Sequence, residues 1–146
     1  MTISEHMTRE HKDCDDFYLN AEKAVLKEEW NEARQAYQKF CQSMEKHFEM
    51  EEQILFPDFE QAHGSEMGPT QVMRYEHEQM RSLMNTTQDA LIKKDKDEFL
   101  GEADTLLMFL QQHNAKEEMM LYPMADQLLA PQGEQVISRM QAIAEN

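Results

Sequence analysis

The sequence has few of the residues that interrupt helices. Its 146 residues include only four glycines and four prolines. Because these residues mark most tight turns, a fold of many short strands is not expected. No apolar run approaches the roughly 20 residues that a membrane-spanning helix requires. The composition therefore favours a few long helices outside the membrane.

Basic residues are also scarce. The 14 lysines and arginines are outnumbered by 29 acidic residues, which gives a formal net charge of −15. Such a surface repels nucleic-acid phosphates and anionic lipids, so we expect neither nucleic-acid nor membrane partners. The first residues, Met1 to His11, are polar and do not resemble a signal peptide. We therefore expect a cytoplasmic protein, with residues 1–146 forming a single domain.

Cysteine is rare as well, with only Cys14 and Cys41 in the chain. Without a secretory signal, two cysteines do not indicate a disulfide framework. Both lie within helical patterns, and we interpret them as small apolar residues of the core.

Apolar residues recur at helical spacing over five stretches. The expected helices cover about residues 4–27, 31–56, 69 or 70 to 92, 96–122, and a short segment after residues 131–133. Ser4 and Thr70 are suited to helix caps, Pro69 to a first turn, and Pro57 to capping, kinking or shifting a helix end. Long helices with short connections predict an all-α fold, an up-down-up-down four-helix bundle with a short C-terminal helix.

One motif occurs twice. The pattern H-x-x-x-E-E-x-x-L-[FY]-P begins at His47 and again at His113, 66 residues later. The pairs Glu10-His11 and Glu76-His77 have the same separation. The bundle is therefore expected to consist of two helical hairpins in tandem. A repeat that retains histidine and glutamate predicts a metal site between its two halves.

Helical geometry selects the candidate ligands. Residues i and i+4 of an α-helix differ by about 40° and share a face, whereas i+5 lies about 140° away. This places each motif's histidine beside its first glutamate, and it leaves Glu52 and Glu118 as supporting or surface groups. The candidate metal ligands are His11, His47, Glu51, His77, His113 and Glu117. Two carboxylates can bridge two ions that each bind two histidines, and this ligand set suits non-haem iron, with manganese or zinc as alternatives.

Two less specific interpretations compete with a metal site. A single histidine on an apolar face is usually a hydrogen-bonded core residue, and one H-x-x-x-E can be a surface pair that contributes ~0.2–0.5 kcal/mol. A duplicated motif with matching single histidines is harder to explain in this way, because burying these groups without a metal is costly. His6 and His63 lie outside the repeat, and we expect both at the surface.

On these motifs the chain resembles the hemerythrin-like, or HHE cation-binding, family from His11 to Pro123. The resemblance implies a four-helix bundle around two iron ions with an oxo or hydroxo bridge. Oxygen-carrying hemerythrins have H-x-x-x-H on the third helix, whereas this chain has Met73 four residues before His77. The set of four histidines and two glutamates is instead similar to that of repair-of-iron-centres proteins, which respond to nitric oxide and oxidative stress.

Three hypotheses of function follow. In the first, a di-iron stress protein reacts with O2, peroxide or NO, or supplies iron for repair, so that iron–sulfur proteins are among its partners. In the second, the protein binds, carries or senses O2 or iron without turnover. In the third, the bundle is purely structural. The absence of a fifth histidine favours a reactive or labile centre over a reversible oxygen carrier.

Overall fold

The computed structural model describes residues 1–65 and 68–145, and the elements within these ranges are helical. The α-helices are α1 (Ile3–Leu26), α2 (Trp30–Met50), α3 (Phe56–His63), α4 (Pro69–Ile92), α5 (Lys96–Lys116), α6 (Tyr122–Leu128) and α7 (Gly133–Glu145). Two π-helical turns, η1 (Glu51–Leu55) and η2 (Glu117–Leu121), join α2 to α3 and α5 to α6, and η3 (Ala130–Gln132) precedes α7.

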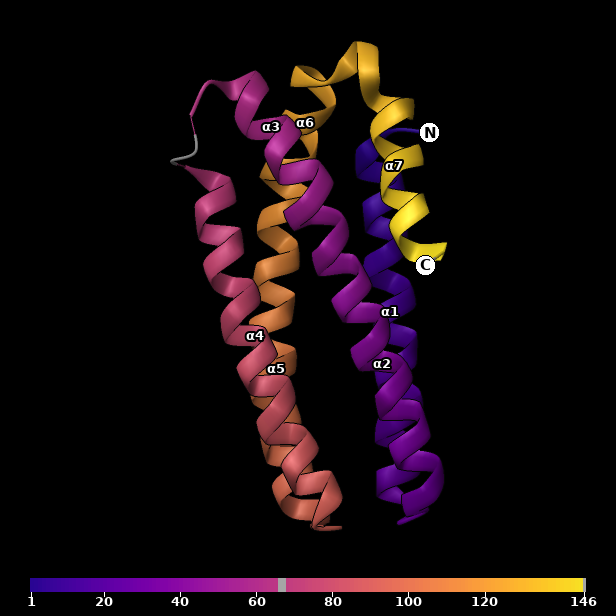
Figure 1. The fold of residues 1–146 in the computed structure, drawn as a ribbon. Helices are drawn as coiled ribbons and strands as arrows, with labels where there is room; N and C mark the ends of the chain where they lie inside the picture. Colours follow the sequence, from indigo (N-terminus) through magenta and orange to yellow (C-terminus); the bar gives the residue numbers. More distant parts are fainter. Residues whose placement is uncertain (66–67, 146) are drawn as a thin grey trace.

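The long helices form two antiparallel hairpins that lie side by side. One hairpin pairs α1 with α2 and the other pairs α4 with α5, and the two turns lie at the same end of the bundle (Figure 1). At the opposite end, α3 and α6 extend the second helix of each hairpin, and α7 folds back over α1 and α2 (Figure 1). The predicted all-α bundle with a short C-terminal helix is confirmed. No helix in the described ranges is long and apolar enough to cross a membrane.

The start of α1 differs from the expectation. The side chain of Thr2, rather than that of Ser4, accepts a hydrogen bond from the backbone N–H of Glu5 and caps the helix. The hydroxyl of Ser4 instead donates to the carboxylate of Asp126 on α6. Asp126 also accepts a hydrogen bond of 2.9 Å from the backbone N–H of Ile3. The prediction that Ser4 is the cap was wrong because a residue from a distant helix competes for its hydroxyl.

Pro69 occupies the first turn of α4, as predicted, but Thr70 is not the cap. The N-cap residue is Gly68, whose φ of 127° is readily adopted only by glycine. The hydroxyl of Thr70 donates to Glu60 on α3 at 2.7 Å. Thr70 therefore links α3 to α4 instead of capping the start of α4.

Two apolar clusters fill the bundle at different heights. The cluster near the hairpin turns includes Tyr18, Tyr37, Phe40, Phe99 and Leu106, and the cluster near α7 includes Ile3, Phe56, Phe59, Val136 and Met140. The candidate ligands occupy the layer between them along the helices. Apolar packing above and below keeps water out of this layer. Electrostatic interactions are stronger in such a dry environment than in water.

We expect Asp126→Ala to lower the free energy of unfolding by about 1–2 kcal/mol, because the first N–H groups of α1 lose their partner. Chemical unfolding of the metal-free protein would measure the change. Asp104→Ala, an exposed substitution on α5, is the control and should change stability by no more than about 0.5 kcal/mol. Equal losses in the two variants would contradict the role of Asp126 as a tie between α1 and α6.

Candidate metal centre

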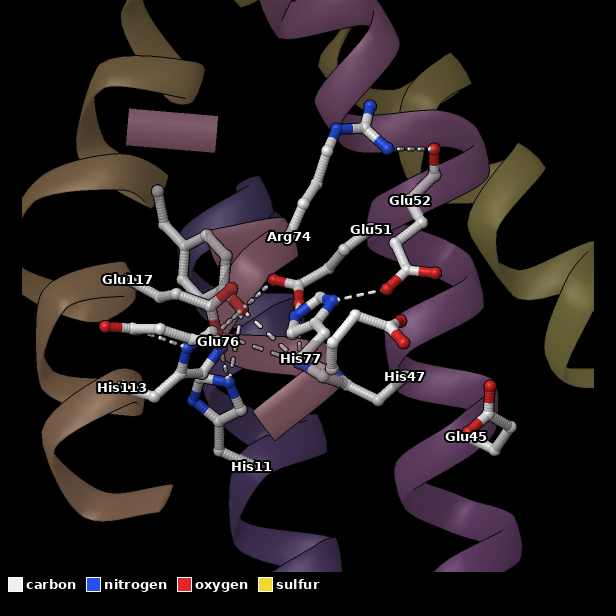
Figure 2. A network of polar contacts seen from close by, with 12 residues as sticks. His11, Glu45, His47, Glu51, Glu52, Arg74, Glu76, His77, His113 and Glu117 are labelled. Carbon is white, nitrogen blue, oxygen red and sulfur yellow. Dashed lines mark hydrogen bonds and ion pairs between the residues drawn. The ribbon is translucent and has the colours of Figure 1, made fainter. Parts of the chain in front are cut away.

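The structure brings all six candidate ligands together inside the bundle (Figure 2). His11 comes from α1 and His77 from α4, while each repeated motif supplies one histidine and, at the first position of its π turn, one glutamate. All six side chains are buried, and the most accessible residue, His11, is only 5% exposed. Residues separated by more than 100 positions therefore share one enclosed polar layer.

The spacing of the polar atoms is that of ligands around an ion. The Nε2–Oε1 distances are 3.0 Å for His11–Glu117, 3.0 Å for His77–Glu51, 3.3 Å for His113–Glu117 and 3.5 Å for His47–Glu51. Adjacent donors of an octahedral ion with bonds of about 2.1 Å lie about 3.0 Å apart. These contacts are therefore compatible with bonds from the same atoms to a cation between them.

The donors divide into two neighbouring groups. One group contains Glu51, His77, His113 and Glu117, with one donor atom of each residue within 4.8 Å of the others. The second contains His11, His47 and Glu117 under the same criterion. We refer to these groups as the His77–His113 position and the His11–His47 position. Glu117 belongs to both and is placed to contact two ions.

The second glutamate of each motif orients a histidine from the other hairpin. Glu52 lies 2.6 Å from Nδ1 of His77, and Glu118 lies 2.6 Å from Nδ1 of His11. Because a carboxylate accepts a hydrogen bond, Nδ1 of each ring is the donor. In a neutral imidazole, Nε2 then keeps its lone pair directed at the centre, which is how carboxylates prepare histidine for a metal.

Glu76 performs the same task for a third histidine. Its carboxylate lies 2.8 Å from Nδ1 of His113 and also accepts a hydrogen bond from Lys116. The repeated Glu-His pair could have indicated a role for Glu76, but only the histidine of the pair, His77, was predicted as a site residue from the sequence. The equivalent Glu10 does not mirror the contact, since it lies 3.7 Å from Nε2 of His6. Nδ1 of His47 has no hydrogen-bond partner among the described residues.

His6 is not a surface residue, contrary to the prediction. It is 7% exposed, because α6 and α7 cover the first turns of α1. Burial lowers the pKa of its imidazole below the usual 6.5. The sequence alone could not show that α7 returns to this end of the bundle. His63 is exposed, as expected, with its ring stacked on Phe59.

The buried carboxylates attract positive charge. Burial opposes a charged imidazole, but hydrogen bonds to Glu117 and Glu118 outweigh it and raise the pKa of His11 to about 10. The same competition raises the pKa of His77 to about 9. Burial and the charge of Glu117 raise the pKa of Glu51. A site that holds protons so firmly beside its carboxylates is also electrostatically suited to a cation.

Besides Nδ1 of His47, two further atoms of the ligand residues lack hydrogen-bond partners among the described residues. They are Nε2 of His113 and Oε2 of Glu117, both fully enclosed. Leaving a buried polar atom unpaired costs about 1–3 kcal/mol. A metal ion would satisfy both atoms, so the residues present fit a bound cation.

Tyr122 was not predicted from the sequence as a residue of the site, because the helix widens into the π turn η2 just before it. In η2 the backbone N–H of Tyr122 donates to the carbonyl of Glu117, five residues earlier. A turn of this kind aligns residue i+5 with residue i, and the hydroxyl of Tyr122 donates to Oε1 of Glu117 at 2.9 Å. Pro123, just after this turn, and Pro57, just after η1, were the available signals. Pro57 shifts the hydrogen bonding of its helix, which continues to His63.

Comparison with protein families gives an independent result. Residues 2–125 match the family model described as the hemerythrin HHE cation binding domain. No curated protein and no solved structure matches the chain. The family match spans both hairpins and all the residues of the centre. The chain therefore belongs to the hemerythrin HHE cation-binding family, and its buried histidine and glutamate cluster is able to hold a metal ion.

Proposed function

We propose that this chain is a non-haem di-iron protein of the hemerythrin-like family. In this proposal one ion binds at the His11–His47 position and the other at the His77–His113 position. Glu51 and Glu117 bridge the ions, together with an oxo or hydroxo group. The observation that carries the proposal is the convergence of four Nε2 atoms on two buried carboxylates at ligand spacing.

Iron is the metal that we favour. Imidazole and carboxylate ligands suit iron, and bundles that pair these groups hold di-iron and di-manganese centres. Both cysteines belong to or pack against the apolar cluster near the hairpin turns, so no thiolate from them enters the ligand set. Manganese and zinc accept similar ligands and are the alternatives that metal analysis would distinguish.

We further infer that the centre reacts with O2, peroxide or NO, or supplies iron in a stress response or in the repair of iron centres. Two histidines, two bridging glutamates and the oxo or hydroxo bridge give each ion five donors, whereas an octahedral ion takes six. Met73 is 3% exposed and lies in the apolar cluster near α7, and a thioether is a weak ligand for iron. Positions thus remain for a small molecule, and iron–sulfur proteins are the partners that a repair role would require.

Binding without turnover is the alternative function. The helices surround the centre, which lies between the two apolar clusters, and its bridging glutamates are 0% exposed. Exclusion of water favours a stable complex of iron with a diatomic molecule. An O2 or iron carrier or sensor would use the same ligands.

Metal content tests the ligand assignment. We expect anaerobically purified wild-type protein to hold two iron ions, and His47→Ala and His113→Ala to lose iron because each removes one nitrogen donor. Elemental analysis of the folded proteins gives the result, and His63→Ala, at an exposed position, is the matched control. Unchanged iron in His113→Ala would support the purely structural bundle.

A second comparison separates the glutamates of each motif. Glu51→Gln and Glu117→Gln should remove the bridge and prevent one ion from binding. Glu52→Gln and Glu118→Gln retain an oxygen acceptor for Nδ1 but lose its charge, so we expect metal affinity to fall by only about 10–100-fold. Competition with a chelator measures the affinities. A greater loss in the Glu52 and Glu118 variants would overturn the choice of i+4 over i+5.

Reaction with small molecules distinguishes the two functions. We expect the reduced, iron-loaded protein to consume NO or peroxide over several cycles when a chemical reductant is supplied. Rapid mixing with O2, peroxide and NO, followed by optical spectroscopy and product analysis, checks this. A stable and reversible O2 complex without consumption would instead establish the carrier or sensor.

A further inference from the structure

The hydroxyl of Tyr122 lies among the donors of one metal position. Its oxygen is 3.1 Å from Nε2 of His11, 3.4 Å from Nε2 of His47, 2.7 Å from Oε2 of Glu51 and 2.9 Å from Oε1 of Glu117. These distances cluster around the separation of about 3.0 Å between adjacent donors of an octahedral ion. The tyrosine oxygen therefore has the spacing of another donor at the His11–His47 position.

Packing alone does not account for this hydroxyl. The repeat equivalent of Tyr122 is Phe56, which follows the other π turn and stacks on His77 with ring centroids 5.6 Å apart. Both rings are 0% exposed, so phenylalanine fills the equivalent space without an oxygen. The two halves thus supply a phenol to one position and a phenyl ring to the other.

The hydroxyl of Tyr122 also has more polar neighbours than its one proton can bond. A phenol has one proton, whereas the oxygen of Tyr122 has two carboxylate oxygens and two imidazole nitrogens around it. The hydroxyl can donate to only one of the two carboxylates, and it accepts from an imidazole only where that nitrogen carries a proton, so hydrogen bonding does not satisfy all four neighbours at once. A cation bound by the tyrosine oxygen would interact favourably with all of them.

We propose that Tyr122 is a direct ligand of the ion at the His11–His47 position, an inference that rests on the di-iron function proposed above. The phenol O–H bond breaks, the proton passes to solvent, and the oxygen donates an electron pair to ferric iron without any transfer of electrons between redox states. This ion then has five protein donors and its neighbour four. Small molecules consequently bind at the His77–His113 position, where more coordination sites remain.

Optical and resonance Raman spectra of the ferric protein test the proposal. We expect wild-type protein to show a visible phenolate-to-iron charge-transfer band with enhanced tyrosine vibrations. Tyr122→Phe should lose both signals, and it should fold because it reproduces the packing of Phe56. Tyr75→Phe, at a residue that is 64% exposed, is the control and should keep them.

A double variant tests the two-fold geometry. Phe56→Tyr combined with Tyr122→Phe moves the phenol to the opposite half of the repeat, and we expect the charge-transfer band to return. Circular dichroism and iron analysis accompany every spectrum. Iron-loaded wild-type protein without the band, or a Tyr122→Phe variant that retains it, would overturn tyrosine ligation while the di-iron function stands. Failure of wild-type protein to bind iron would overturn both.

Discussion

Burial of Glu51 and Glu117 is the constraint on which this bundle depends. Both carboxylates are 0% exposed and lie between two apolar clusters. A buried carboxylate is costly unless it is paired and hydrogen-bonded, so every long helix must contribute a compensating group. The four histidines meet this requirement, one from each helix. Their positions fix the rotation of the helices about their axes, and the apolar residues then follow the helical period on either side.

The ligands nearly obey the internal repeat, but their surroundings do not. Glu52 accepts hydrogen bonds from His77 and Arg81, and these outweigh burial to lower its pKa to about 2. The residue equivalent to Arg81 in the other half is Asp15, so Glu118 has no such cation at that position. Because Arg81 neutralises Glu52, this carboxylate attracts the Nδ1 proton of His77 less strongly than an unpaired carboxylate would. Two ions held by equivalent ligands would therefore differ in the electron density that they receive.

The sequence was sufficient for the parts of the structure that depend on uniform helical periodicity. Five helical segments and the pairing of His47 with Glu51 follow from a rotation of about 100° per residue. That rotation fails inside η1 and η2, which is why Tyr122 could not be placed against Glu117 from spacing. The burial of His6 depends on a distant helix. Such contacts between elements are not encoded in local periodicity.

The consecutive glutamates explain how one centre can also join the two hairpins. Consecutive residues of a helical turn point in different directions, so Glu51 lies fully buried in the centre while Glu52 contacts His77 and Arg81 on the neighbouring helix α4. Together they hold both nitrogens of His77, at 3.0 and 2.6 Å. Glu117 and Glu118 hold His11 at the same two distances. The paired glutamates of each hairpin thus contact both ring nitrogens of a histidine from the other hairpin. Separating the hairpins would expose the ligands and remove the charged partners of Glu52 and Glu118, so the stability of the bundle and the integrity of the metal centre depend on the same contacts.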